Sequence, residues 1–364
     1  MSFYRGTENL TEVSAKQWDY ITQENLTARE AVAFLYSGMQ TRTFRDVLRQ
    51  VCPDAEQSDR LTEGLCAINP DAQPDSIRRK VQNWMGGKAL PTQREDVFQI
   101  CFALGLDLEQ SDRMLGLLTD QGIHYRNVGE MIYAYCLRFR LPYSYARQLQ
   151  RQFEKKPEAD GHHYPVTRVI QQEFQSVQAE EDLFSFIARH RDKLGTQHNT
   201  AYSYFCKMLG LLTGEALEGE QTYSMEYVAE EYLRLNVPKD KNTARYTDVQ
   251  KLVKKYWPSP RSIKAMKSRA EDIGRKTLLL MYLVTGGIWE QEYDELDEPY
   301  IQPEEFLEIH CHRMNRMLME CGMRRIDPRS VFDFLLLYCL RPEEEVCMSQ
   351  RMSQLAAELF VEEP

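Results

Sequence analysis

The 364-residue sequence lacks any run of 18 or more apolar residues, which excludes a transmembrane helix. Its first 18 residues, MSFYRGTENLTEVSAKQW, lack the apolar core of a secretory signal peptide. The nine cysteines are scattered singly, without a C-x-x-C pair, which indicates reduced and mostly buried thiols. These absences together predict a cytoplasmic protein that does not associate with membranes.

Catalytic motifs are also missing: the chain contains no G-x-S-x-G, no Walker-type loop, no H-E-x-x-H and no readable Cys–His dyad. One cluster, His310, Cys311 and His312 with Cys321 nearby, has the residue types of a metal site. On a helix, however, residues 310 and 312 point about 200° apart and cannot easily chelate one ion. We therefore expect no metal, no cofactor and no enzymatic activity.

Alternating β-type patterns of convincing length are absent as well, and apolar residues recur instead at helical spacing. Residues 27–39 begin with Thr27 and Glu30 in the arrangement of a capping box. Residues 128–139 (VGEMIYAYCLRF) are apolar nearly all round, which is typical of a helix at the centre of a core. Residues 155–165 are polar and contain Pro and Gly, as linkers do. The predicted fold class is all-α.

An excess of positive charge is absent overall, because the formal net charge is −10. This balance argues against a general coat for nucleic acid. Within residues 239–276, however, twelve Lys and Arg face four Asp and Glu, whereas residues 288–306 carry eight acidic residues and no basic one. The basic segment could bind phosphates, or the acidic segment could fold back on it as a salt-bridge partner or an autoinhibitory lid.

Residues 75–105 (DSIRRKVQNWMGGKALPTQREDVFQICFALG) read as two helices separated by a defined turn. We expect Asp75 to be the N-cap of the first helix, and Ile77, Val81 and Trp84 to form its buried face. Gly86 and the residue after it would end this helix. The other faces carry residue types that contact phosphates or base edges, namely Ser76, Arg78, Arg79, Lys80, Gln82 and Asn83.

The run WMGGKALP (residues 84–91), followed by a helix ending in FALGLD (residues 102–107), resembles the phage-repressor-like helix-turn-helix family of the xenobiotic-response-element type. The resemblance covers about residues 41–118. It implies a compact helical DNA-binding domain in which residues 75–85 form the recognition helix. Arg79 and Asn83 would then lie nearest the bases, and Arg78, Lys80 and Lys88 would hold phosphates.

Several short segments recur later in the chain in the same order, which indicates an internal duplication. DRML (112–115), Gly122 and YCLR (135–138) recur as NRML (315–318), Gly322 and YCLR (338–341), with a local gap at the glycine. The same alignment places Arg275 opposite Arg94 and Ser262-Ile263 opposite Ser76-Ile77. It predicts a second recognition helix over residues 261–273, with Ile263, Met266, Ala270 and Ile273 inside and Arg261, Lys264, Lys267 and Arg269 outside.

These patterns predict an N-terminal domain over residues 1–154, a linker and helical middle segment over residues 155–238, and a C-terminal domain over residues 239–364. The function that they favour is a cytoplasmic DNA-binding transcription regulator of bacterial or phage type. DNA would be its partner, with a protein partner or homodimerisation as further possibilities. The alternative is a helical adaptor that binds proteins through its helix-turn-helix-like repeats.

Overall fold

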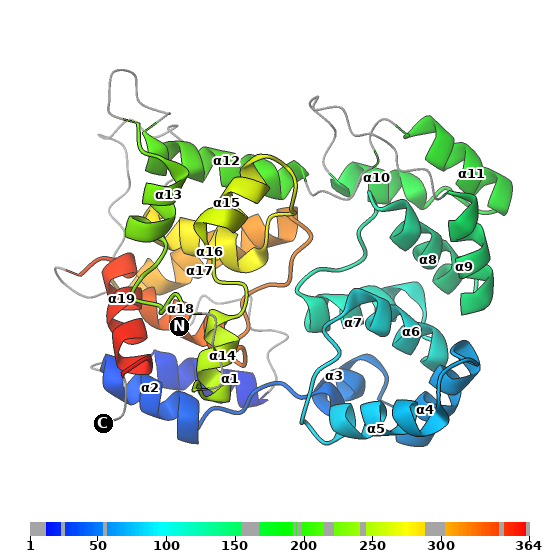
Figure 1. Cartoon of the computed structure of the whole chain (residues 1–364), viewed down its shortest axis with the longest axis horizontal. Coiled ribbons are helices and arrows are strands. Elements are labelled where there is room, and N and C mark those ends of the chain that lie inside the picture. Colours follow the sequence, from blue (N-terminus) through cyan, green and yellow to red (C-terminus); the bar gives the residue numbers. More distant parts are fainter. Residues whose placement is uncertain are drawn as a thin grey trace. The chain divides into compact units, whose positions relative to one another are not determined.

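A computed structural model describes residues 12–22, 26–53, 57–153, 167–191, 194, 199–214, 222–240, 245–287, 303–341 and 346–361. Within these ranges every regular element is helical, which confirms the all-α prediction (Figure 1). The contacts group the chain into two compact units. Unit 1 comprises residues 1–41, 201–318 and 325–364, and unit 2 comprises residues 42–200 and 319–324. The three-domain division expected from the sequence stays a prediction, and the first 41 residues group with the second half of the chain.

Unit 2 is a succession of short helices joined by tight turns. Its helices are α3 (Phe44–Val51), α4 (Gln57–Ile68), α5 (Pro74–Met85), α6 (Arg94–Leu104), α7 (Leu108–Thr119), α8 (Val128–Arg138), α9 (Tyr143–Gln152), α10 (Thr167–Phe174) and α11 (Glu180–Arg189). The helix predicted over residues 128–139 is α8, and residues 131–137 of it are all buried. Because α8 is apolar on every side, it packs against α6, α7, α9 and α11 and forms the centre of the unit.

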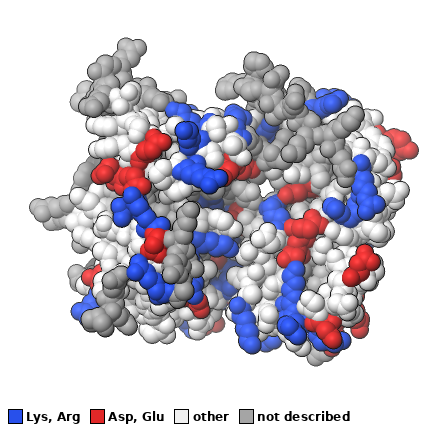
Figure 2. All heavy atoms as spheres, in the orientation of Figure 1, with Lys and Arg blue, Asp and Glu red and all other residues white. Residues whose placement is uncertain are grey.

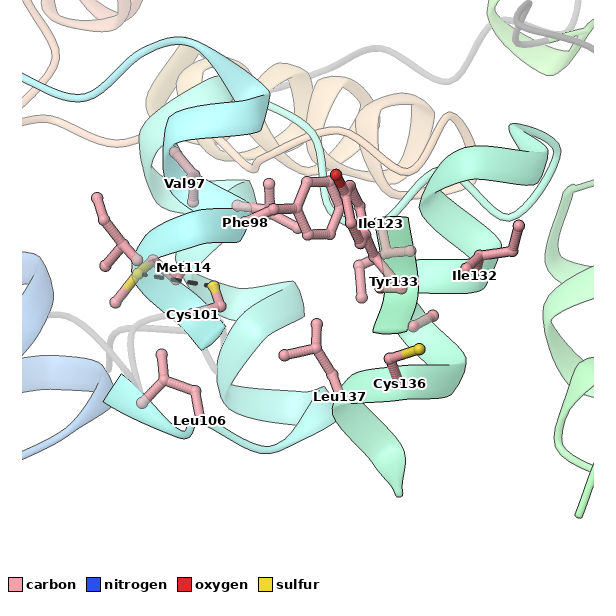
Figure 3. Packing of buried hydrophobic residues seen from close by; sticks show 14 of the residues in the cluster. Val97, Phe98, Cys101, Leu106, Met114, Ile123, Ile132, Tyr133, Cys136 and Leu137 are labelled. Carbon is pink, nitrogen blue, oxygen red and sulfur yellow. Dashed lines mark hydrogen bonds between the residues drawn. The ribbon is translucent and has the colours of Figure 1, made fainter. Parts of the chain in front are cut away.

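Figure 3 shows how α6, α7 and α8 meet in this core. Phe98 of α6 and Tyr133 of α8 are both buried, and their ring centroids are 4.5 Å apart. Cys101 and Met114 join α6 to α7 through a sulfur–sulfur contact of 4.0 Å. Burial raises the pKa of the Cys101 thiol to about 12, so it behaves as an apolar core residue rather than a nucleophile.

Helices α4 and α6 approach each other unusually closely at Gly64. A Cβ atom added at Gly64 would lie 2.6 Å from the main-chain oxygen of Ala103. Only a residue without a side chain therefore lets the two backbones meet here. This contact fixes α4 on α6, and α5 then packs against α4 and α3.

Unit 1 joins both ends of the chain. Its helices are α1 (Glu12–Ile21), α2 (Ala28–Ser37), α12 (Asn199–Thr213), α13 (Met225–Tyr227), the π-helix η1 (Val228–Tyr232), α14 (Asp248–Lys254), α15 (Pro260–Lys267), α16 (Arg275–Val284), α17 (Pro303–Glu320), α18 (Val331–Cys339) and α19 (Met348–Leu359). Every residue of α18 is buried, so α18 has the central position here that α8 has in unit 2. Helices α1, α2, α14 and α19 pack around it.

The N-terminal segment is held in unit 1 by main-chain carbonyls as well as by apolar packing. Thr27 caps α2 in a capping box with Glu30, as predicted from the sequence. The guanidinium of Arg341 donates to the Leu26 carbonyl over 2.7 Å, and that of Arg329 donates to the carbonyls of Gln40 and Thr41 over 3.2 Å each. These bonds connect residues that lie 288, 289 and 315 positions apart in the chain.

Candidate nucleic-acid interface

Helix α5 begins one residue earlier than the sequence suggested, and Asp75 is not its N-cap. Gln73 is the N-cap residue and Pro74 occupies the first helical position. Proline is favoured there because its fixed φ suits the helix and its missing N–H would have no helical partner. Asp75 lies in the first turn, where its carboxylate accepts from the guanidinium of Arg78 over 2.8 Å.

The two faces of α5 differ as the sequence predicted. Ile77, Val81 and Trp84 are buried, and the indole of Trp84 packs against the ring of Phe44 from α3 at 5.8 Å between centroids. The opposite face is open to solvent: Ser76, Arg78, Arg79, Lys80 and Gln82 are exposed and Asn83 is half-buried. The predicted site residues of this helix therefore lie on one accessible surface.

Part of the positive charge on α5 is already neutralised by neighbouring carboxylates. Besides the pair of Arg78 with Asp75, the ammonium of Lys80 lies 2.7 Å from Asp96 of α6 and 5.1 Å from the centre of the Trp84 ring. The Arg78–Asp75 pair is largely exposed and the Lys80–Asp96 pair is partly exposed, so each contributes little to stability. A phosphate could replace either carboxylate as the partner of its cation.

A tight turn after α5 positions Lys88 beside the helix end. The main-chain N–H groups of Lys88 and Ala89 both donate to the Asn83 carbonyl, over 3.0 and 3.3 Å. Gly87 has a φ of 72°, in the left-handed region that glycine adopts at little cost. Lys88 is exposed, as its predicted role in holding a phosphate requires.

The second predicted recognition helix, over residues 261–273, is shorter than expected. Helix α15 ends at Lys267, because Arg269 turns into the left-handed region at φ 57°. Ile263 and Met266 form its buried face, whereas Ala270 is exposed and Ile273 is buried in the connection to α16. The prediction that the helix continues to residue 273 was therefore wrong.

The predicted contact residues of this second helix divide into two groups. Arg261 and Lys264 are exposed and Lys267 is half-buried. Arg269 does not project from the helix: its guanidinium lies 3.9 Å above the ring of Tyr202 from α12. The Tyr202 hydroxyl in turn donates to the Lys267 carbonyl over 2.9 Å. Arg269 thus joins α15 to α12 and was wrongly placed among the outward-facing residues.

Much of the basic charge between residues 239 and 276 is used inside unit 1. The Lys254 ammonium donates to the carbonyls of Pro238 and Asp240, and desolvation by burial lowers its pKa. The Lys276 ammonium donates to the carbonyls of Val253 and Lys255, near the C-terminal end of α14. Arg245 pairs with Asp240 over 3.0 Å. The net charge of +8 in this segment therefore does not correspond to one basic surface.

On the face seen in Figure 2, each unit carries Lys and Arg side chains interspersed with Asp and Glu. Neither unit presents an uninterrupted basic surface on that face. Each cluster of cations is small, and any phosphate contact would come from a few side chains at a helix rather than from a broad field.

The histidines that the sequence placed on opposite sides of a helix have different environments on α17. His310 is buried, and its Nδ1 lies 2.7 Å from the Tyr282 hydroxyl, whereas His312 is exposed. Burial lowers the pKa of His310 to about 4, which keeps its ring neutral. Among the described residues there is no group of three or more His, Cys, Asp or Glu that could hold a metal ion.

The sequence reasoning missed an aromatic surface beside α15. Tyr223 and Tyr227 are exposed and their rings stack 4.7 Å apart, and α13, which contains Tyr227, packs against α15. Their spacing of four residues was the available signal. Residues 288–302 of the acidic segment (288–306) and the linker at residues 155–165 lie outside the described residues.

Comparisons with known proteins find no matching protein-family model, no matching curated protein and no matching solved structure. Among the described helices, none is long and apolar enough to cross a membrane.

Proposed function

We propose that this chain is a cytoplasmic, non-enzymatic DNA-binding regulator of repressor type, in which α5 enters the major groove. The observation that carries the proposal is the two-sided character of α5. Its apolar side is buried against α3 and α4, while its opposite side presents Arg, Lys, Gln, Ser and Asn side chains to solvent. A helix held in this way can present polar side chains to base edges without rearrangement of its core.

Each residue of the interface has a role that follows from its position. Arg79 and Asn83 lie one helical turn apart and would contact bases, because Arg matches the two acceptors of guanine and Asn matches the acceptor and the donor of adenine. Arg78, Lys80 and the turn residue Lys88 would contact phosphates. Arg78 and Lys80 would exchange their carboxylate partners, Asp75 and Asp96, for phosphate oxygens. In unit 1, Arg261 and Lys264 supply further exposed cations.

The proposal is tested by binding to random-sequence duplex DNA at several salt concentrations. We expect Arg78→Ala/Arg79→Ala to weaken binding and to reduce the slope of log affinity against log salt by roughly one, as loss of the Arg78 phosphate contact requires. Arg113→Ala/Arg151→Ala is the matched control, because it removes the same charge from exposed positions on α7 and α9. Equal weakening by both variants, or no binding by the wild type at low salt, would contradict the proposal.

A helical adaptor for protein partners is the second candidate. The mixed charge of the α5 surface favours it, since Asp75 and Asp96 lie directly beside Arg78 and Lys80. Absence of DNA binding at low salt, with capture of a protein that Arg78→Ala/Arg79→Ala releases, would support this second candidate.

A further inference from the structure

A hydrogen-bonded network of unit 2 recurs in unit 1. In unit 2, the Ile123 N–H donates to the Asp112 carboxylate eleven residues earlier over 2.7 Å. In unit 1, the Ile326 N–H donates to the side-chain oxygen of Asn315, again eleven residues earlier, over 2.8 Å. The aspartate and the asparagine stand at the same position of the repeated DRML and NRML segments. The sequence repeat therefore coincides with a repeated three-dimensional contact.

The same network contains an arginine from the first turn of the preceding helix. In unit 2, Arg94 makes a two-pronged ion pair with Glu130 at 2.6 and 2.5 Å and donates to the carbonyl just before Ile123. In unit 1, Arg275 also makes a two-pronged ion pair, with Asp333 at 2.7 and 2.8 Å, and donates to the carbonyl just before Ile326.

The acceptors of the two ion pairs complete the correspondence. The carboxylates of Glu130 and Asp333 each accept from a main-chain N–H six residues earlier, at His124 and Asp327.

Gly122 and Gly322, which the sequence alignment paired, do not correspond in the structure. Gly322 has a left-handed φ of 68°, whereas Gly122 makes room for the Asp112 carboxylate, whose Oδ1 would lie 2.6 Å from an added Cβ. Their alignment was therefore wrong, although the segments around them correspond.

The turn after α15 also repeats the turn after α5. The N–H groups of Ala270 and Glu271 both donate to the Ala265 carbonyl over 2.8 and 3.3 Å, as those of Lys88 and Ala89 donate to the Asn83 carbonyl. Turns of this type are common at helix ends. Here, however, the turn stands in both units directly before the helix that supplies the network arginine, so its place as well as its geometry is repeated.

The helices that precede these turns begin in the same way and bury the same position. Both α5 and α15 begin with proline at the first helical position. Ile77 and Ile263, each preceded by a serine, are buried in both. Helix α15 is four residues shorter, with eight residues against twelve, and its exposed side carries Arg261 and Lys264. By position and by exposed chemistry, α15 is the counterpart of α5.

We propose that α15 is a second DNA-reading helix, so that one chain contacts two half-sites of a duplex. In a symmetric dimer, by contrast, each of two subunits contacts one half-site. This inference rests on the proposed function of α5. Linking two modules in one chain makes the second contact intramolecular, which raises affinity by roughly a hundredfold or more without any new contact. Because α5 and α15 differ in length and in side chains, the two half-sites must differ in sequence.

The test begins with selection of binding sites by the full chain from a pool of duplexes with a random region of about 30 bp, long enough for two half-sites about one helical turn apart. We expect two unlike blocks of fixed bases. Arg261→Ala/Lys264→Ala should lose one block and weaken binding roughly a hundredfold, while Arg78→Ala/Arg79→Ala should lose the other. Arg113→Ala/Arg151→Ala, on α7 and α9, is again the charge-matched control.

The outcomes separate this inference from the function on which it rests. A single selected block that disappears only in the α5 variant, with the α15 variant equal to the control, overturns the second reading helix and leaves the first. Loss of binding only in the α15 variant overturns the assignment of α5. Two identical blocks together with two bound chains per duplex would show a conventional dimer and also overturn the inference.

Discussion

Asp112 is a largely buried carboxylate at a position where unit 1 carries Asn315, and both accept the same main-chain hydrogen bond. Desolvation raises the pKa of Asp112 above its usual value, 3.8, although Arg94 and the Ile123 N–H lower it in part. A raised pKa means that the folded state binds the proton more tightly than the unfolded state. The stabilising effect of this proton is therefore fully present below the unfolded pKa and is lost as the pH rises through the folded pKa.

We therefore expect Asp112→Asn to increase the free energy of unfolding at pH 7 by roughly 1 kcal/mol, because a buried charge is replaced by a neutral acceptor. The gain should shrink as the pH falls, because the wild-type carboxyl then becomes protonated. Urea unfolding at pH 4, 5.5 and 7 measures the difference. Asp59→Asn, at an exposed position of α4, is the control and should show no such pH dependence. A variant less stable than the wild type at pH 7 would contradict this explanation.

At the scale of the helices, Gly64 determines how closely α4 and α6 approach. In Gly64→Ala the new methyl group would lie 2.6 Å from the Ala103 oxygen and 2.9 Å from its Cα, and a main-chain atom cannot move aside cheaply. We expect this substitution to destabilise the protein by about 1–3 kcal/mol, as overpacked cores do. Thermal unfolding followed by circular dichroism measures the effect.

Gly116 provides the matched control, since it also lies within a helix, α7, but its added Cβ would meet nothing closer than 4.0 Å. Gly116→Ala should be stabilising by roughly 0.5–1 kcal/mol, because alanine loses less conformational entropy in a helix. If both substitutions changed the melting temperature in the same direction, the close contact at Gly64 would not be the cause.

The sequence predicted the elements better than their ends and their partners. Periodicity located the buried faces of α5 and α8, and the Thr27 capping box located the start of α2. The prediction that Asp75 is the N-cap of α5 was wrong, because it relied on the Asp75 carboxylate and overlooked that Pro74 favours the first helical position. Periodicity extended α15 to residue 273 because Ala270 and Ile273 continue the apolar spacing, although Arg269 turns into the left-handed region.

The composition of the basic segment was a poorer guide to the candidate site. A count of charges cannot distinguish Arg261, which is exposed, from Lys276, which donates to main-chain carbonyls near the end of α14. The carbonyls that accept from Lys276 lie at the end of α14, more than twenty residues earlier in the chain. Only folding brings them close to the Lys276 ammonium. The repeat was more informative, because it paired Arg94 with Arg275 before their common network was visible.

At the scale of the whole molecule, unit 1 depends on a segment that precedes unit 2 in the chain. Arg341 and the carbonyl of Leu26 are 315 residues apart in sequence, and local patterns carry no signal for such a contact. Residues 42–200, by contrast, enclose a buried core that runs from Phe44 to Leu194. The order of segments along the chain thus predicts different behaviour for the two halves of the protein when they are separated.

A fragment of residues 42–200 should fold alone. It loses the partly exposed Arg324–Asp120 ion pair and the two main-chain hydrogen bonds that join residues 322 and 324 to Gly122 and Asp120, so its melting temperature should fall by several degrees. A fragment of residues 201–364 should not fold cooperatively, because α18 and α19 lose the apolar cover of α1 and α2 and the Arg329 and Arg341 guanidinium groups lose their carbonyl acceptors. Adding residues 1–41 as a separate peptide should restore a cooperative thermal transition, followed by circular dichroism. A cooperative transition of residues 201–364 by themselves, unchanged by the peptide, would show that unit 1 does not need the N-terminal segment in order to fold.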